Sequence, residues 1–533
     1  SGDGGAITET KENYILVWSL ADFNLTSPSS FTVDMVVFPI LEWEPSFVEE
    51  EGEEKYYEVW ISKSPVFTED ETITYQTTNT YLYPEVDLEV GTTYFWKVSA
   101  NQYDHQVWAD MGGSAYWMFT TVYHTEQLHP MIDGEIAGHR TLIPENSPYY
   151  SSQNPFTAYG KDLTVQSGVE IQFSEGTELL IGGNLYINGT EGDSIYFTGY
   201  DEQGEWNGIR FSDNDFPRDT LFVNEDHSYI SGNIIEYANI GQCTKVLETD
   251  VDMFITNSHF QEFATGVNIG DGSYILNSVF ENSTDDTNDG YAVYNGIYFE
   301  NNSINNIQGY GIQANAEASF INNTIQNCTS YGIKNGGSLF ENNTISDNGN
   351  YGISCDAQAV LTENIIHNNN GNGVTGGITF TNNEVTENSG YGINGGSLLD
   401  SNIVSNNGSY AINCNTNAIL SNNTIENNSG YAIADGQVIT GNTIKFNQSG
   451  SSNLITSSSV TQFSDNIAEN NQSFRLLYFT NLDSLNLSGN QITENQSRIT
   501  LIEISGNSLN ILNNVIDENG NVSNYGGGSA LRI

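Results

Sequence analysis

The sequence predicts an all-β protein in which an antiparallel β-sandwich precedes a long parallel β-solenoid. Over residues 28–122, apolar and polar residues alternate in short runs separated by turn residues, which is typical of a half-buried antiparallel sandwich. From residue 233 on, the phrase Asn, any residue, then usually Ile or Val returns at steps of 19 to 25 residues. A period in the low twenties indicates a solenoid, in which each repeat stacks on its neighbours.

These patterns divide the chain into four segments. Residues 1–27 combine a tether with one apolar segment, residues 28–122 form the predicted sandwich, residues 123–160 a proline-bearing connector, and residues 161–533 the solenoid. Because the chain starts at Ser1 rather than Met, we expect that a leader was removed or the chain was trimmed. The glycine-rich start would suit a tether after a lipidated cysteine upstream of Ser1.

Four stretches of the predicted sandwich resemble a fibronectin type III domain. They are LEWEP at residues 41–45, YEVWI at 57–61, LEVGTTYFWKVSA at 88–100 and FTT at 119–121. The resemblance implies an immunoglobulin-like sandwich in which Tyr94 is the corner tyrosine and Trp43 and Trp96 lie in or near the core. It says little about function, because such modules usually act as spacers or binding platforms.

From residue 163 the sequence runs through short strands separated by glycine turns and reaches Trp206-Asn207-Gly208-Ile209. This pattern resembles the opening of right-handed parallel β-helix proteins of the pectate-lyase-like superfamily. Together with the asparagine repeat behind it, the resemblance implies that a right-handed parallel β-helix extends to the end of the chain.

The first asparagine of each repeat is predicted to lie where the chain bends, so that its amide can bond the equivalent residue in the coils above and below. In one clear copy, which starts at Asn343, alternation places Ile345 inside, and Gly352 relieves a corner where a side chain would clash. The predicted ladder consists of Asn233, Asn257, Asn277, Asn302, Asn323, Asn343, Asn364, Asn383, Asn402, Asn423, Asn442, Asn466, Asn490 and Asn514.

Tyrosines form a second predicted column, in which Asn372 takes one place. Aromatic stacking that holds coil to coil is one interpretation, and a stripe of rings that stack on sugars is the other. The column consists of Tyr310, Tyr331, Tyr351, Tyr391, Tyr410 and Tyr431.

Charge and cysteine usage limit the partners. With 14 Lys+Arg against 67 Asp+Glu, the formal charge of −53 disfavours nucleic acid and anionic lipid surfaces. No stretch approaches the ~18 apolar residues of a membrane helix. Cys355 and Cys414 share a register but lie three repeats apart, about 14 Å, which exceeds the reach of a disulfide. We therefore predict free buried thiols.

A catalytic site is not predicted. β-Helix enzymes that cleave acidic polysaccharides need clustered carboxylates on one face, with calcium and a basic residue or with a second carboxylate. Over residues 161–533 only nine Lys and Arg occur, and the repetitive middle has almost none. Asp285, Asp286 and Asp289 make one loop a candidate calcium site, although Thr287 breaks EF-hand spacing. The alternative is a plain polar loop without cofactor.

These observations favour an extracellular, non-enzymatic surface protein whose rod acts as spacer, adhesin or filament subunit. Its expected partners are other surface proteins or copies of itself, with glycans as a further class. An apolar end at residues 529–533 leads us to expect that more chain or a partner covers the last coil. The alternative is a carbohydrate-active enzyme or carbohydrate-binding protein, and clustered carboxylates with one Arg or Lys on a single face would favour it.

Overall fold

The computed structural model describes residues 20–47, 55–103, 105–111, 115–122, 131–200, 204–212, 217–285, 290–521 and 531–532. The chain forms two compact units, an N-terminal unit (Ser1–Met131 with Ala137–Ser147) and a solenoid unit (Ile132–Ile136 with Pro148–Ile533). Within the described residues, helical structure is limited to the short 3₁₀ turns η1 (Glu69–Glu71), η2 (Ala109–Met111) and η3 (Pro144–Asn146). The chain is therefore all-β, as predicted.

The N-terminal unit contains two sheets. The smaller has the order β1 (Leu25–Ser27), β3 (Leu41–Trp43) and β6 (Tyr81–Leu82). The larger has the order β2 (Thr32–Met35), β9 (Trp117–Thr121), β7 (Thr93–Gln102), β4 (Lys55–Ser62) and β5 (Thr72–Thr77), and β8 (His105–Trp108) pairs with β7. β11 (Arg140–Leu142) belongs to the same unit. Aromatic side chains dominate the core, where Trp43 and Trp96 are buried as expected.

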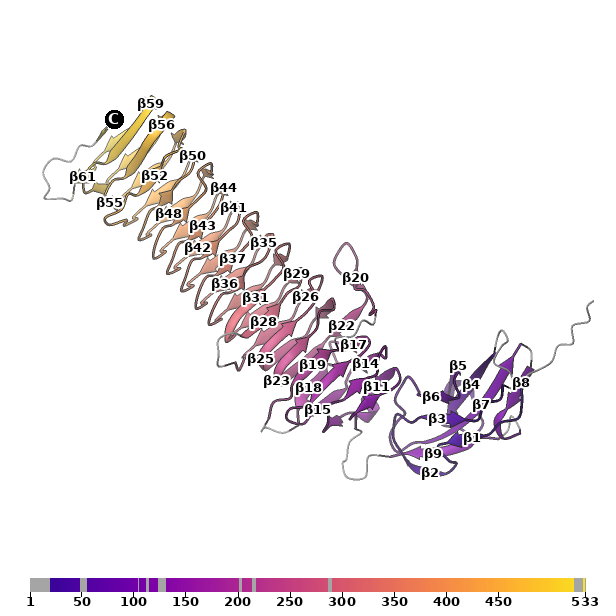
Figure 1. Cartoon of the computed structure of the whole chain (residues 1–533). Coiled ribbons are helices and arrows are strands. Elements are labelled where there is room, and N and C mark those ends of the chain that lie inside the picture. Colours follow the sequence, from indigo (N-terminus) through magenta and orange to yellow (C-terminus); the bar gives the residue numbers. More distant parts are fainter. Residues whose placement is uncertain are drawn as a thin grey trace, which may run out of the picture. The chain divides into compact units, whose positions relative to one another are not determined.

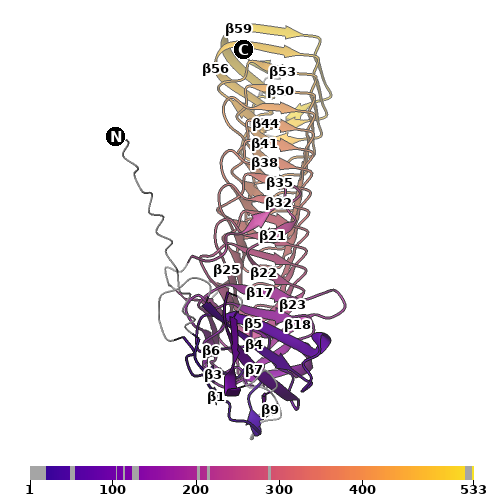
Figure 2. The same ribbon diagram turned by 90° about the vertical axis from the view of Figure 1, so that its right-hand side faces the viewer.

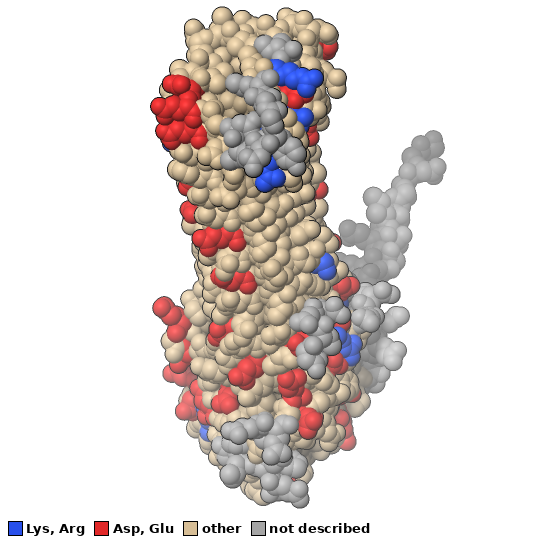
Figure 3. Space-filling model, turned by 90° about the vertical axis from the view of Figure 1, so that its left-hand side faces the viewer, with Lys and Arg blue, Asp and Glu red and all other residues tan. Residues whose placement is uncertain are grey.

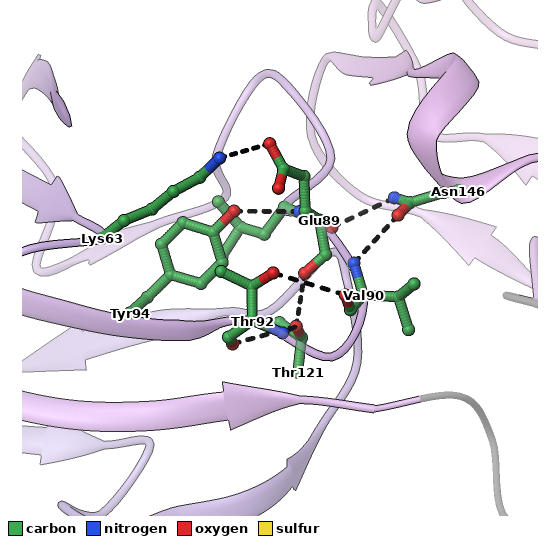
Figure 4. A network of polar contacts seen from close by, with 8 residues as sticks. Lys63, Glu89, Val90, Thr92, Tyr94, Thr121 and Asn146 are labelled. Carbon is green, nitrogen blue, oxygen red and sulfur yellow. Dashed lines mark hydrogen bonds and ion pairs between the residues drawn. The ribbon is translucent and has the colours of Figure 1, made fainter. Parts of the chain in front are cut away.

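Tyr94 fixes a loop of this unit by a hydrogen bond. The backbone N–H of Glu89, five residues upstream, donates to the Tyr94 hydroxyl at 3.0 Å. Asn146 holds the same loop from a distant part of the chain, because its Oδ1 accepts from Val90 N at 3.0 Å and its Nδ2 donates to Leu88 O at 3.0 Å (Figure 4). Burial raises the Tyr94 pKa to about 12, which keeps this hydroxyl protonated at neutral pH.

The solenoid unit is a stack of coils in which parallel strands form three columns (Figures 1 and 2). Column 1 contains β10 (Glu135–Ile136), β13 (Phe156–Thr157), β16 (Glu178–Ile181), β19 (Gly208–Phe211), the ends of β23 (Ala238–Glu248) and β25 (His259–Asn268), β28 (Gly290–Tyr294), β31 (Gly309–Gln313), β34 (Ile333–Lys334), β37 (Ile353–Ser354), β40 (Val374–Thr375), β43 (Ile393–Asn394), β46 (Ile412–Asn413), β49 (Ile433–Ala434), β52 (Ile455–Ser457), the starts of β56 (Leu477–Ser488) and β59 (Ile502–Leu512), and β62 (Leu531–Arg532).

Column 2 is the stack that Figure 2 shows from β32 to β53. It contains β14 (Leu163–Gln166), β17 (Leu185–Asn188), β22 (Asn233–Glu236), β24 (Met253–Thr256), β26 (Tyr274–Leu276), β29 (Tyr298–Glu300), β32 (Ser319–Ile321), β35 (Leu339–Glu341), β38 (Val360–Thr362), β41 (Thr379–Thr381), β44 (Leu398–Asp400), β47 (Ile419–Ser421), β50 (Val438–Thr440), β53 (Gln462–Ser464) and the ends of β56 and β59.

Column 3 completes each coil. It contains β12 (Tyr149–Ser151), β15 (Glu170–Phe173), β18 (Ile195–Gly199), the starts of β23 and β25, β27 (Val279–Glu281), β30 (Ser303–Asn305), β33 (Thr324–Gln326), β36 (Thr344–Ser346), β39 (Ile365–His367), β42 (Glu384–Thr386), β45 (Ile403–Ser405), β48 (Thr424–Glu426), β51 (Thr443–Lys445), β54 (Ile467–Glu469), β57 (Gln491–Thr493) and β60 (Val515–Asp517). Outside the columns lie the hairpin β20 (Phe222–Val223) and β21 (Tyr229–Ser231), and a small sheet of β55 (Gln472–Ser473), β58 (Gln496–Ser497) and β61 (Gly520–Asn521).

Parallel pairing begins inside the residues that the sequence analysis assigned to the connector. β10 pairs with β13, and β12 pairs with β15 in register. The spacing of these strands is irregular and their sequences lack the asparagine phrase, so the repeat pattern does not extend to them. The stack of coils therefore starts before residue 161.

Each regular coil buries one apolar residue from each of its short strands. Ile345 in column 3, Phe340 in column 2 and Ile353 in column 1 are all fully buried. Phe320 and Phe340 stack on each other along the axis, with ring centroids 4.9 Å apart. At the corner before column 1, Gly352 allows the next coil to approach closely, because a Cβ there would lie 2.8 Å from Asn369 Nδ2 and from Gly373 O.

The predicted asparagine ladder is confirmed from Asn302 to Asn514, at the corner between columns 2 and 3. Along this run each backbone N–H donates to Oδ1 of the next ladder asparagine, as Asn343 does to Asn364 at 3.0 Å. Its Nδ2 also donates to that oxygen, and to a column 2 carbonyl that for Asn343 is Phe320 O. Every amide group is thereby satisfied in a buried corner.

Three asparagines of the predicted ladder lie elsewhere. Asn257 and Asn277 have positive φ and form the bend itself, one residue before the ladder position. Ser258 and Ser278 occupy the ladder there, and Ser278 Oγ accepts from Ser258 N at 3.2 Å. Asn233 is the first residue of the column 2 strand β22, and its Oδ1 accepts from Leu185 N. The phrase Asn-x-Ile or Asn-x-Val fits Asn233 and Asn277 as well, whereas Asn257 is followed by Ser258 and His259. The phrase therefore identifies corners without fixing the register.

A second ladder occupies the corner between columns 3 and 1. It comes from the second asparagine of the repeat Asn-x-Ile-x-x-Asn, for which the sequence analysis had no separate role. Asn388 Nδ2, for example, donates to Asn407 Oδ1 at 3.1 Å. The ladder consists of Asn348, Asn369, Asn388, Asn407, Asn428, Asn447, Asn471, Asn495 and Asn519.

Candidate functional site

The tyrosine column lies at the entrance to column 1, where every member is half-buried. Tyr391 and Tyr410 are stacked with centroids 4.8 Å apart and an interplanar angle of 14°, and Tyr410 meets Tyr431 edge-on at 4.4 Å. Tyr331 and Tyr351 form a further pair at 5.3 Å. Tyr391 and Tyr410 turn their faces to each other, whereas the other two pairs meet edge to face. These ring contacts between neighbouring coils favour the coil-to-coil role. Stacking on a ligand stays a prediction.

Only part of the candidate calcium loop lies within the described residues. Asp285 precedes β28, whereas Asp286 and Asp289 lie outside the described residues. Among the residues that the structure describes, no group of three or more His, Cys, Asp and Glu is placed to hold a metal ion. Calcium binding at this loop stays a prediction. The four cysteines are free, and Cys243, Cys328 and Cys414 are buried, whereas Cys355, which was expected to be buried, is only partly so.

A row of outward side chains on column 1 leads to a cavity that the sequence analysis missed. Strand register aligns Arg210 with Glu248, Glu248 with Asn268, and Asn268 with Tyr294. The residue before each of them is buried, so the four side chains point outward from consecutive coils. We call this line of residues the groove row.

The cavity at the groove row has a volume of about 480 Å³. Besides the four residues of the groove row, its lining includes Asp250 and Asp271 from the loops that follow β23 and β25. A second hollow of about 200 Å³ shares Arg210 and Glu248 with it and adds Glu178 and Lys245. We call the two hollows together the groove.

Ion pairs hold the charged groups of the groove in place. Arg210 donates Nε to Glu178 Oε1 at 2.9 Å and an Nη to Glu178 Oε2 at 2.7 Å, a bidentate pair that fixes the plane of the guanidinium. Lys245 Nζ lies 2.8 Å from Glu248 Oε2. Carboxylates and cations thus gather on a single face, the feature expected of the carbohydrate-active alternative.

Tyrosines border the groove on the side of the following coils. Tyr294 lines the cavity, and its ring centroid lies 5.7 Å from that of Tyr291. Burial, with smaller effects from Tyr310 and Glu248, raises the Tyr291 pKa to about 12. Carboxylates and an amide that can bond hydroxyl groups, beside an aromatic wall, are the groups with which proteins hold sugars. The carboxylates can also act as acid or base.

The groove could not be located from the repeat because its coils are irregular. The steps from Arg210 to Glu248, Asn268 and Tyr294 are unequal, whereas the asparagine repeat has an almost constant period. One signal was available. Each residue follows a buried apolar one at or next to the end of a strand, as in Ile209-Arg210 and Leu247-Glu248. The same pattern continues through Ile312-Gln313 and Ile333-Lys334.

A second cluster of aromatic residues lies in the N-terminal unit. Lys97 Nζ lies 4.6 Å from the ring centroid of Trp60, 4.5 Å from that of Phe67 and 4.3 Å from that of Trp108. Burial lowers the Lys97 pKa. The three rings surround a cation of the chain itself, so this cluster stabilises the sheet through cation–π contacts.

The surface of the molecule carries far more acidic than basic side chains. Figure 3 shows red carboxylates scattered over one face, few blue groups, and broad uncharged areas between them. Among the described residues, no helix has the length and apolar character needed to cross a membrane.

Comparison with known proteins supports the solenoid. Residues 244–396 match a family model described as a right handed beta helix region. Together with the parallel strand columns, this match identifies the solenoid as a right-handed parallel β-helix. A search of curated proteins found no match.

Two solved structures illustrate the similarity. The A-module of mannuronan C-5 epimerase AlgE4 from Azotobacter vinelandii is 11% identical, with 75% of this chain and 91% of that chain covered and a TM-score of 0.19. The family 28 exopolygalacturonase of Yersinia enterocolitica is 10% identical, with 92% and 100% covered and a TM-score of 0.15. Similarity this distant carries no conclusion about activity.

Proposed function

We propose that this protein binds an extended glycan in the groove on column 1 of its β-helix. The supporting observation is the cavity of about 480 Å³ in which Arg210, Glu248, Asn268, Asp271 and Tyr294 come together. Hydroxyl groups of a sugar can donate to the carboxylates and accept from the amide and the guanidinium, and Tyr294 offers an apolar surface to the ring. Strand register continues the groove row along the axis, which suits a polymer better than a small compact ligand.

Catalysis at this site would use the carboxylates. A glycosidic bond placed between two of them could be protonated by one while the other assists attack, as in glycoside hydrolysis in general. The carboxylates would also stabilise the positive charge that develops on the sugar ring in the transition state. The groove supports glycan binding directly. Cleavage of the bound glycan is a further step that we propose.

A non-enzymatic rod is the second candidate, and the regular coils favour it. From Gln313 on, strand register continues the outward row through Lys334, Ser354, Thr375, Asn394 and Asn413, none of which is a carboxylate. A surface of this kind suits a spacer, adhesin or assembly subunit outside the cell, with surface proteins or further copies as partners.

The N-terminal unit would then serve as a presenting module. Its two sheets and the Tyr94 hydrogen bond support a fibronectin type III-like sandwich. At the other end of the chain, Leu531 is 43% exposed, and docking on this coil remains part of the rod proposal.

The two candidates are separated by a glycan array probed with the full chain, followed by an assay for new reducing ends and unsaturated products. Glu248→Gln and Asp271→Asn test the groove. Glu384→Gln, an exposed carboxylate of column 3, is the matched control. We expect both groove variants to lose affinity and the control to retain it. Wild-type protein that binds no glycan, or groove variants that bind as wild type does, would favour the rod.

A further inference from the structure

One isolated cation lies on the same column as the groove. Between Lys245 and Lys445 the sequence contains a single Lys or Arg, which is Lys334. In a chain of formal charge −53, a lone positive charge within so long a neutral and acidic stretch is unusual. The position of Lys334 on column 1 of the solenoid indicates its role.

Strand register connects Lys334 to the groove. Asn268 aligns with Tyr294, Tyr294 with Gln313, and Gln313 with Lys334, one coil at a time. Ile312 and Ile333 are buried, so Gln313 and Lys334 point outward as the groove residues do. Lys334 therefore lies three coils from Asn268, or about 14 Å at the spacing of adjacent strands.

The ammonium group of Lys334 is positioned by an aromatic ring. Its Nζ lies 4.3 Å from the ring centroid of Tyr310, a cation–π contact between neighbouring coils. Among the described residues, Lys334 makes no ion pair with a carboxylate. The aligned neighbours Gln313 and Ser354 are uncharged, so its charge is available to a ligand on this face.

We infer that Lys334 forms a subsite for an anionic sugar, carboxylated or sulfated, of the same glycan that occupies the groove. This inference rests on the proposed function. The carboxylates Glu248, Asp250 and Asp271 would repel an anionic group inside the groove, whereas three coils away the outward row carries one positive charge. A pyranose unit is about as long as one strand spacing, so a neutral sugar in the groove and a charged sugar over Lys334 belong to one chain.

The simpler alternative is that Lys334 only packs on Tyr310 and keeps the rod soluble. Ligand length separates the two interpretations. A subsite three coils from the groove matters only for oligosaccharides that are long enough to reach it, and only when they carry charge. A packing lysine would have the same small effect on every ligand.

The experiment is calorimetric titration of the full chain with oligosaccharides from dimer to octamer in three series, neutral, uronate-bearing and sulfated. Lys334→Gln removes the charge, Lys334→Arg keeps it, and Lys445→Gln is the matched control on column 3. For charged oligomers of four or more sugars, we expect Lys334→Gln to lose about tenfold in affinity, the usual effect of losing one charged hydrogen bond. The uronate and sulfated series identify which anion the subsite prefers.

Shorter oligomers and the neutral series should bind Lys334→Gln as they bind the wild type, and Lys334→Arg should retain most of the affinity for long charged oligomers. The inference is overturned if Lys334→Gln matches Lys445→Gln for every ligand, or if it loses affinity equally at all lengths. Those outcomes leave groove binding intact. Loss of the proposed function itself would show separately, as an absence of any effect from Glu248→Gln and Asp271→Asn.

Discussion

Asn364 donates twice to a single oxygen of Asn383 in the next coil. Its backbone N–H lies 3.0 Å and its Nδ2 2.9 Å from Asn383 Oδ1. The same Nδ2 also reaches Phe340 O at 3.0 Å. Each corner is thus connected to the coil after it by hydrogen bonds of one buried side chain, and the bonds repeat along the ladder.

Removal of one ladder amide should destabilise the rod. We expect Asn383→Ala and Asn402→Ala each to lower the free energy of unfolding by about 1–3 kcal/mol, because the buried groups of the neighbouring coil lose their partner. Thr381→Ala, on the outward side of β41, should have little effect. Urea denaturation followed by circular dichroism measures the change, and unaltered midpoints for both asparagine variants would refute the structural role of the ladder.

A substitution at Cys328 should extend the second asparagine ladder by one coil. Cys328 occupies a position of this ladder, and its N–H donates to Asn348 Oδ1 at 3.0 Å while its buried side chain adds no comparable bond. Cys328→Asn should raise the free energy of unfolding by about 1 kcal/mol, the usual net contribution of such a hydrogen bond. Cys328→Ala, which only removes the sulfur, is the comparison. The expectation is wrong if the asparagine variant unfolds at a lower urea concentration than the alanine variant.

Stability should fall in alkaline solution. Burial raises the pKa of the Cys328, Cys355 and Cys414 thiols from 9.0 to about 12. Between about pH 9 and pH 12 the unfolded chain therefore binds fewer protons than the native one, and the free energy of unfolding decreases as pH rises. At about pH 7 and below, the thiols are protonated in both states and contribute no slope.

Urea midpoints measured from about pH 8 to about pH 11 test this dependence. A variant in which all three cysteines are replaced by alanine should lose less stability over the same range. Equal slopes for the variant and the wild type would show that the thiols titrate normally. A thiol reagent at about pH 8 should likewise label the buried Cys328 and Cys414 only after unfolding.

The regular half of the fold could be predicted because one physical requirement recurs in every coil. A buried corner needs an amide side chain. A three-residue strand whose outer side chains point outward needs an apolar residue in the middle. The pattern of Asn343 and Ile345 therefore predicts where each of them lies in the coil. In the early coils, Ser258 and Ser278 occupy the same corner, and their hydroxyl groups accept the backbone N–H that an asparagine Oδ1 accepts later. A serine at this position does not match the asparagine phrase. The register was therefore misassigned at Asn257 and Asn277.

The groove could not be predicted from the sequence, for a different reason. Arg210 and Glu248 are far apart in sequence because the hairpin β20–β21, strand β22 and the start of β23 lie between them, and only the three-dimensional register brings them side by side. The low number of basic residues in the solenoid argues against a catalytic site. Two of the nine, Arg210 and Lys245, nevertheless line one groove, and a third, Lys334, lies on the same column.

A crystal structure of the full chain with the oligosaccharide that binds best on the array tests the central claim most directly. We predict a sugar in the groove beside Glu248 and Tyr294, with the glycan running along column 1 toward Lys334. A glycan bound to any other face, or a groove that stays empty at saturating ligand, would contradict the proposed function.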